Sequence, residues 1–142
     1  MFKEKTFTIP ELKGISIKNI EEHLKLYAGY VKHSNLILDH INELSKDSEK
    51  NAYELGELQR RFSFEFDGMR NHEYYFSSLE NGPRSLEDTS PLKSAIEKEW
   101  GSFDVWLARF KSIAMTRGVG CAMLYYDKSS GHLLNAWVEE QH

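Results

Sequence analysis

The first half of the chain repeats apolar residues every three or four positions, the pattern of an amphipathic helix. From a cap at Ser16 or Asn19, this series consists of Ile20, Leu24, Tyr27, Val31, Leu36, Ile37, Ile41 and Leu44. A second series, over about residues 53–79, consists of Leu55, Leu58, Phe62, Phe66, Met69, His72, Tyr75 and Phe76. The polar stretch 46–51 separates the two series. The pattern therefore predicts two long helices joined by a short turn, which form an antiparallel hairpin.

The second half has a different pattern. A loop over residues 81–91 precedes two shorter helices, at about 91–100 and 102–116. Two stretches that favour strands follow, at 121–126 and 133–138, with turn-forming residues between them. These elements predict two strands that pair as a hairpin.

The expected fold class is therefore α+β: an N-terminal antiparallel helical hairpin followed by a C-terminal α/β lobe with a small antiparallel sheet. We place the boundary in the Gly- and Pro-containing loop, which gives an N-terminal lobe of residues 1–82 and a partial C-terminal lobe of residues 83–142. An isolated two-stranded sheet is only marginally stable. The second lobe is therefore expected to be truncated.

Composition narrows the class of protein. Hydrophobic residues make up 40% of the 142 residues and aromatic residues 13%, which is enough for a packed core. A net charge of −4 gives no electrostatic reason to expect a nucleic-acid partner. No apolar run is long enough for a membrane span, and no apolar signal region follows Met1, so we expect a cytoplasmic protein. The single cysteine, Cys121, excludes an internal disulfide.

Two histidines are the main candidates for chemistry. His23 lies near the start of the first predicted helix and His72 near the end of the second. Antiparallel packing makes those two ends neighbours, so the two imidazoles could bind one redox metal. The alternatives are a surface position for His23 and a hydrogen-bonded core position for His72. We expect His33 and His40 to be solvated and His132 to be exposed in the turn between the strands.

Five stretches, in this order, resemble the iron/manganese superoxide dismutase family. They are His23 with Tyr30-Val31, residues 71–76, residues 95–104, residues 118–120 and residues 135–141. In that family three His and one Asp hold the metal, and His23 and His72 match the first two His positions. The resemblance implies that the Asp and the third His follow the second strand, beyond His142. Asp104-Val105-Trp106 lies in the wrong place to replace them, and no His follows it closely.

The resemblance also implies residues around the metal. Tyr30 matches the tyrosine at the entrance of the pocket, although Tyr27 competes because His23 and Tyr30 are one residue closer than in many members. Seven residues are two helical turns, so His23 and Tyr30 still share a face. Gln141 matches a glutamine that faces the metal-bound water. Gly68 and Gln141 together resemble the manganese-type members, so the expected cofactor is manganese or iron, with manganese favoured.

Two functional hypotheses follow. In the first, the chain belongs to a superoxide dismutase that converts superoxide to oxygen and hydrogen peroxide, and that can form a homodimer. In the second, it is a non-catalytic, superoxide-dismutase-like interaction or assembly subunit. Whether it is an enzyme stays open, because only half of the ligands are found in these 142 residues. We expect the chain by itself to bind iron or manganese weakly and to remove little superoxide.

Overall fold

The computed structural model describes residues 1–140, which form two compact units, residues 1–83 and residues 84–140. Each unit is described separately below. Gln141, one of the predicted site residues, lies outside the described residues. Whether the chain divides into the predicted lobes 1–82 and 83–142 stays a prediction.

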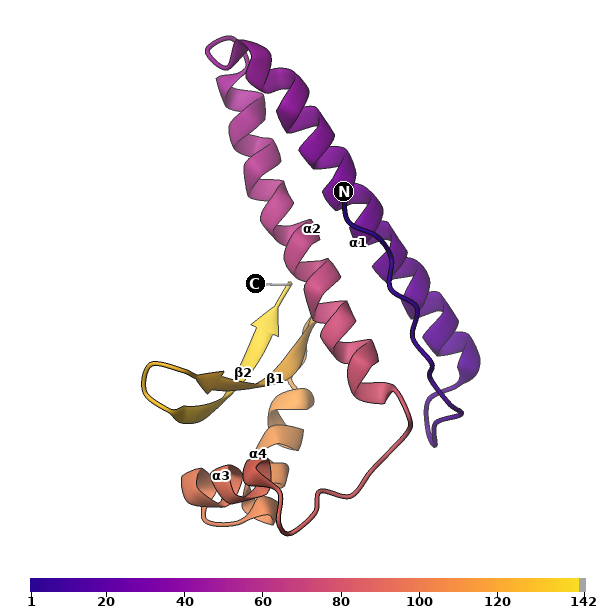
Figure 1. Cartoon of the computed structure of the whole chain (residues 1–142), viewed down its shortest axis with the longest axis vertical. Coiled ribbons are helices and arrows are strands. Elements are labelled where there is room, and N and C mark those ends of the chain that lie inside the picture. Colours follow the sequence, from indigo (N-terminus) through magenta and orange to yellow (C-terminus); the bar gives the residue numbers. More distant parts are fainter. Residues whose placement is uncertain (141–142) are drawn as a thin grey trace. The chain divides into compact units, whose positions relative to one another are not determined.

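The first unit is built on an antiparallel pair of long helices (Figure 1). Helix α1 (Ile17–Leu44) leads through a short 3-10 turn, η1 (Ser45–Asp47), to helix α2 (Ala52–Leu79). Ser16, and not Asn19, caps α1: its hydroxyl accepts a hydrogen bond from the Asn19 amide at 3.1 Å. At the turn, the Asn51 side chain donates to the Leu44 carbonyl at 3.0 Å. The predicted helical hairpin is confirmed.

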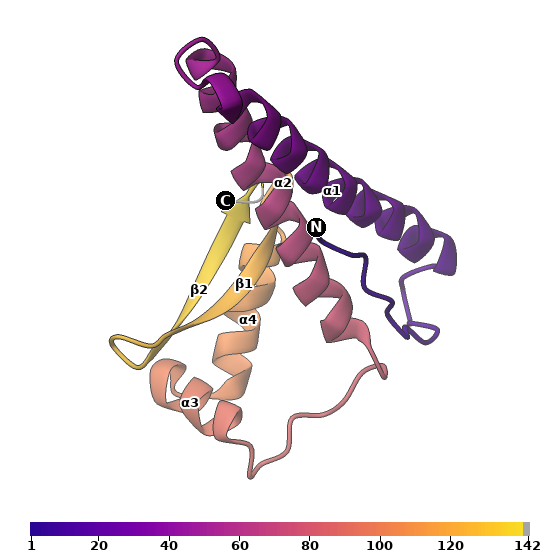
Figure 2. The ribbon, with the colours of Figure 1, turned by 45° about the horizontal axis from the view of Figure 1, so that its top comes forward.

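An extended N-terminal segment runs beside α1 (Figures 1 and 2). Together with the inward faces of α1 and α2 it encloses the core of this unit. The buried core residues are Tyr27, Val31, Met69 and Phe76. Phe2, Phe7 and Ile9 of the N-terminal segment pack against them. Burial of each large apolar side chain stabilises the fold by about 1.5–3 kcal/mol, so the segment contributes to the stability of the hairpin.

The second unit contains two helices and two strands. These are α3 (Pro91–Trp100), α4 (Phe103–Ala114), β1 (Gly120–Asp127) and β2 (His132–Glu139). The strands pair antiparallel, from Gly120 opposite Glu139 to Asp127 opposite His132. Together with the helical hairpin, this sheet confirms the predicted α+β class. The last helix is shorter than the predicted 102–116, because it is capped by Ser102 and ends at Ala114.

Side chains join the sheet of the second unit to its helices. The Trp106 indole donates to Asn135 Oδ1 at 3.0 Å, which connects α4 to β2. His132 Nδ1 lies 2.8 Å from Glu99 Oε1, so this half-exposed histidine pairs with α3. These contacts connect both helices to β2.

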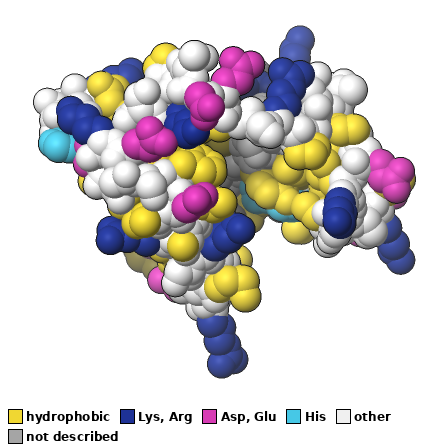
Figure 3. Space-filling model, turned by 90° about the horizontal axis from the view of Figure 1, so that it is seen from below, with side chains coloured by type: hydrophobic (Ala, Val, Ile, Leu, Met, Phe, Trp, Pro, Cys, Tyr) yellow, Lys and Arg dark blue, Asp and Glu magenta, His cyan; other side chains and the backbone are white. Residues whose placement is uncertain are grey.

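Among the described residues, no helix combines the length and the apolar character that crossing a lipid bilayer requires. On the face drawn in Figure 3, Lys and Arg side chains are spread singly among acidic and apolar ones.

Candidate metal centre

The first unit brings the two predicted histidines together. His23 is in the second turn of α1 and His72 is near the end of α2, and their ring centroids lie 4.8 Å apart with the rings at 80°. His72 is only 8% exposed, and His23 is partly buried. His23 is therefore not a fully solvated residue of the helix surface, and the two imidazoles lie against each other between the helices.

A backbone hydrogen bond orients the imidazole of His72. Its Nδ1 lies 2.6 Å from the carbonyl oxygen of Gly68, one helical turn earlier. A carbonyl oxygen can only accept, so we assign the proton to Nδ1. The lone pair is then on Nε2. Metal-binding histidines are commonly held in this way, with the second ring nitrogen donating to a carbonyl or carboxylate.

Burial favours the neutral form of both imidazoles. It lowers the pKa of His72, although the hydrogen bond with the Gly68 carbonyl opposes that shift. Burial, and then the proximity of His72, lower the pKa of His23 below its ordinary value. Since a metal ion binds the neutral ring, neither nitrogen donor has to lose a proton near neutral pH.

Of the two candidate tyrosines, Tyr30 lies against the histidine pair. Its ring centroid is 4.9 Å from that of His72. Gly68 makes this contact possible, because a Cβ at that position would lie 2.6 Å from two atoms of the Tyr30 ring. His23 and Tyr30 are two helical turns apart on α1. The rings of both residues contact the imidazole of His72.

Tyr27, the competing tyrosine, has a different environment. Its side chain is 2% exposed, and its hydroxyl accepts from the Lys5 amide at 2.9 Å and donates to Glu73 Oε1 at 3.2 Å. The Tyr27 hydroxyl is thus engaged with Lys5 and Glu73. This arrangement favours Tyr30 for the entrance position that the sequence left open between the two.

Aromatic side chains form the wall of the pocket. The centroids of Tyr75 and Phe76 each lie 5.0 Å from that of His23, and Phe76 is fully buried. These two rings cover part of the His23 imidazole. The helical pattern predicts such an aromatic cluster, and the structure shows which members of it contact the pair.

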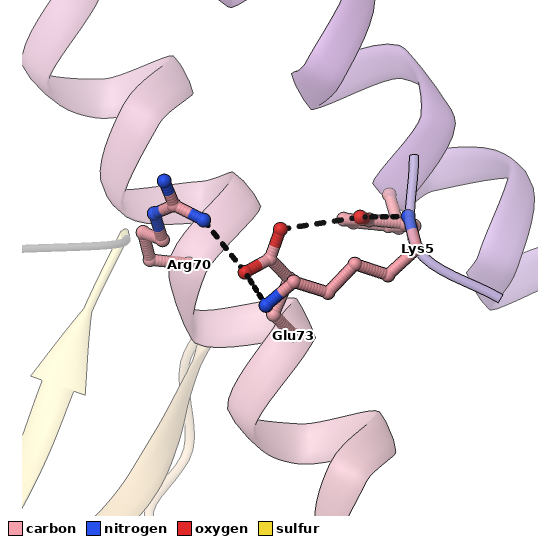
Figure 4. A network of polar contacts seen from close by, with 4 residues as sticks. Lys5, Arg70 and Glu73 are labelled. Carbon is pink, nitrogen blue, oxygen red and sulfur yellow. Dashed lines mark hydrogen bonds and ion pairs between the residues drawn. The ribbon is translucent and has the colours of Figure 1, made fainter. Parts of the chain in front are cut away.

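The sequence did not identify the polar cluster next to His72. Glu73 is a buried acid whose carboxylate contacts Lys5, Arg70 and Tyr27, as Figure 4 shows for the first two. Burial raises the pKa of Glu73, but hydrogen bonds from Lys5 and Arg70 outweigh that effect, so its pKa lies below the usual range. The only signal in the sequence was an acid on the inward face of an aromatic-rich helix.

The donor set fits the imidazole part of an iron or manganese site. Two neutral imidazoles from facing helices suit either metal. Within residues 1–140 no group of three or more His, Cys, Asp or Glu side chains is arranged to bind a metal. Of the other histidines, His40 is exposed and His33 Nδ1 lies 3.8 Å from Glu65 Oε2. A metal held by His23 and His72 alone would therefore be bound weakly.

Comparisons with known proteins point to one family. Residues 88–142 match the family described as iron/manganese superoxide dismutases, C-terminal domain. The iron superoxide dismutase of Cupriavidus metallidurans is 35% identical over 133 residues, which are 92% of this chain and 66% of that protein. The iron enzyme of Aquifex pyrophilus is 33% identical, over 87% of this chain and 59% of its own length.

Manganese enzymes match as well. The manganese superoxide dismutase of Mycolicibacterium smegmatis is 32% identical, over 84% of this chain and 56% of its own length. The chain thus spans between about half and two thirds of the length of the curated relatives that it matches. Both metals occur in the names of these relatives.

Proposed function

Because the chain belongs to the iron/manganese superoxide dismutase family, we propose that His23 and His72 bind the metal of a mononuclear iron or manganese centre. The centre converts two superoxide ions and two protons into dioxygen and hydrogen peroxide. One observation carries the proposal: the rings lie 4.8 Å apart, and the His72 ring is fixed by the Gly68 carbonyl with Nε2 available. An iron or manganese ion held by the two imidazoles would supply the one-electron redox chemistry of this reaction.

The other residues of the pocket have supporting roles. Tyr30 packs against His72 and brings a hydroxyl, the type of group that passes protons, to the rim of the pocket. Tyr75 and Phe76 exclude bulk water from His23. For Gln141, the role beside the metal-bound water is proposed from the family resemblance alone.

The choice of metal stays at iron or manganese. The resemblance at Gly68 and Gln141 favours manganese. Gly68 also has a steric reason to be glycine, since the Tyr30 ring occupies the space of its missing side chain. Its identity is therefore weak support for manganese. A homodimer and a cytoplasmic location stay predictions as well.

The second candidate is a non-catalytic, superoxide-dismutase-like interaction or assembly subunit. One observation favours it: within residues 1–140, the histidine pair has no carboxylate or third imidazole grouped with it. Without a carboxylate, less of the charge of a metal ion is balanced. The two candidates differ in whether His23 and His72 bind metal.

Metal binding and superoxide removal test the proposal. Mn²⁺ and Fe²⁺ affinities are measured for the chain and for His23→Ala and His72→Ala, with His40→Ala, at an exposed position on α1, as the matched control. We expect weak binding that falls at least about tenfold in either site variant, with no change in the control. Equal affinities in all four proteins would contradict the proposal and favour the assembly role.

Superoxide removal is assayed on the same metal-loaded samples. We expect little activity from this chain, and less still from His72→Ala. Stoichiometric metal together with high activity would show that further ligands exist which the pair does not include.

A further inference from the structure

A buried carboxylate lies directly after His72 in α2. The Glu73 side chain is 6% exposed. Its Oε2 accepts from Lys5 Nζ at 2.7 Å and from Arg70 Nη1 at 2.8 Å, as Figure 4 shows, and its Oε1 accepts from the Tyr27 hydroxyl at 3.2 Å. A buried charge is tolerated only when such partners compensate it. Glu73 therefore joins α2 to α1 and to the N-terminal segment.

That segment, residues 2–9, is here called the strap. Its backbone forms hydrogen bonds on either side of Lys5, with Asn35 of α1 and with Glu80, the residue that follows α2. Phe2 donates its amide to Asn35 Oδ1 at 2.7 Å and accepts from Asn35 Nδ2 at 2.9 Å. The Thr8 amide donates to Glu80 Oε1 at 2.9 Å. The strap is thus attached at its two ends, with Glu73 bound at its middle.

The strap also reaches the histidines through rings. Phe7 packs against Tyr27 at 5.7 Å and against Phe76 at 5.3 Å between centroids. Phe76 in turn contacts His23 at 5.0 Å and His72 at 6.2 Å. Close-packed interiors transmit small displacements. A displacement of the Phe7 ring therefore also displaces the imidazoles of His23 and His72.

We infer that Glu73 is a positioning residue, which clamps the strap and α1 to α2 and so sets the position of the His72 imidazole relative to His23 for metal binding. The inference rests on the proposed function of the histidine pair. It assigns a role in metal binding to the strap, which contains neither of the proposed ligands. Because Glu73 adjoins His72, any rotation of α2 that releases the carboxylate also turns the imidazole.

The test replaces Glu73 by Gln, which keeps the size of the side chain and removes its charge. The matched control is Glu65→Gln: Glu65 lies two turns earlier on α2, its side chain is 4% exposed, and Arg61 donates to it at 2.9 and 2.6 Å. Both variants lose a buried ion pair. Only Glu73→Gln should disturb the histidine pair.

The first readout is the ¹⁵N spectrum of the histidine rings in the full, metal-free chain. In the unaltered protein, His72 should be a single tautomer with its proton on Nδ1, as the Gly68 contact requires. In Glu73→Gln we expect shifted ring signals at His72, because the imidazole changes its position relative to the rings of His23 and Phe76, and in Glu65→Gln the unaltered signals. Equal His72 spectra in the two variants would overturn the inference.

The second readout is Mn²⁺ affinity, which we expect to fall about tenfold in Glu73→Gln and less than twofold in Glu65→Gln. Phe7→Leu keeps the charged cluster and weakens the ring contacts, so it provides a second variant in case Glu73→Gln does not fold. It should also shift the His72 ring signals, and unchanged signals would count against the role of the strap. The metal-free spectra separate the two ideas, since they test positioning even if Mn²⁺ does not bind.

Discussion

Gly68→Ala tests the packing that brings Tyr30 to His72. The added Cβ would lie 2.6 Å from two Tyr30 ring atoms and 3.1 Å from a third. Carbon atoms in contact prefer about 3.5–4.0 Å, so the ring has to move by about 1 Å. Overpacking of this kind costs about 1–3 kcal/mol, whereas replacing a helical glycine by alanine stabilises by about 0.5–1 kcal/mol. We therefore expect a net loss of about 1 kcal/mol in the free energy of unfolding.

Gly56→Ala is the matched control, because Gly56 lies in the same helix and nothing is within 4 Å of its added Cβ. It should stabilise the protein by about 0.5–1 kcal/mol. Urea unfolding followed by far-ultraviolet circular dichroism measures both variants. The two variants should differ by about 2 kcal/mol. If Gly68→Ala were as stable as Gly56→Ala, the Tyr30 ring would not occupy the space beside Gly68.

A double-mutant cycle identifies the colliding group. In a Tyr30→Ala background the ring is absent, so Gly68→Ala should change from a loss to a gain of about 0.5–1 kcal/mol. An unchanged loss in that background would assign the effect to some other contact. The placement of Tyr30 at the histidine pair would then have to be abandoned.

Three further replacements test other contacts, each by urea unfolding. Tyr27→Phe removes the hydroxyl that accepts from the Lys5 amide, and it should cost about 1–2 kcal/mol and speed hydrogen exchange at that amide; an unchanged exchange rate would contradict the bond. Ser34 Oγ is fully buried without a hydrogen-bond partner among residues 1–140. Ser34→Ala should therefore raise the free energy of unfolding by about 1 kcal/mol, and a clear decrease would reveal a partner. Asn135→Ala leaves the Trp106 indole without its acceptor and should cost about 1 kcal/mol, with a change in tryptophan fluorescence; full stability would show that the bond is dispensable.

Helical periodicity predicted much of how the candidate site residues are arranged. It placed His23 and His72 at adjacent ends of an antiparallel hairpin, and the spacing of seven placed Tyr30 on the face of His23. It could not separate Tyr30 from Tyr27, because residues three apart share the inward face of a helix. Packing separates them, since Tyr30 fills the space left by Gly68.

The contacts that fix the pocket could not be predicted. Glu73 and Lys5 are 68 positions apart, and no periodic pattern relates an extended segment to a helix. Trp106 and Asn135 of the second unit, 29 positions apart, show the same limit. Local patterns predict which face of a helix is buried, and only the folded chain shows which polar group meets which.

The most direct test of the central claim is a Mn²⁺ titration of the ¹⁵N-histidine-labelled chain. Bound Mn²⁺ broadens the signals of nearby nuclei, so even weak binding is located. The proposed function predicts that the ring signals of His23 and His72 broaden together and at the lowest Mn²⁺ concentration, while those of His33, His40 and His132 persist. Earlier broadening at any of those three histidines, or uniform broadening of all of them, would contradict the assignment of the histidine pair as metal ligands.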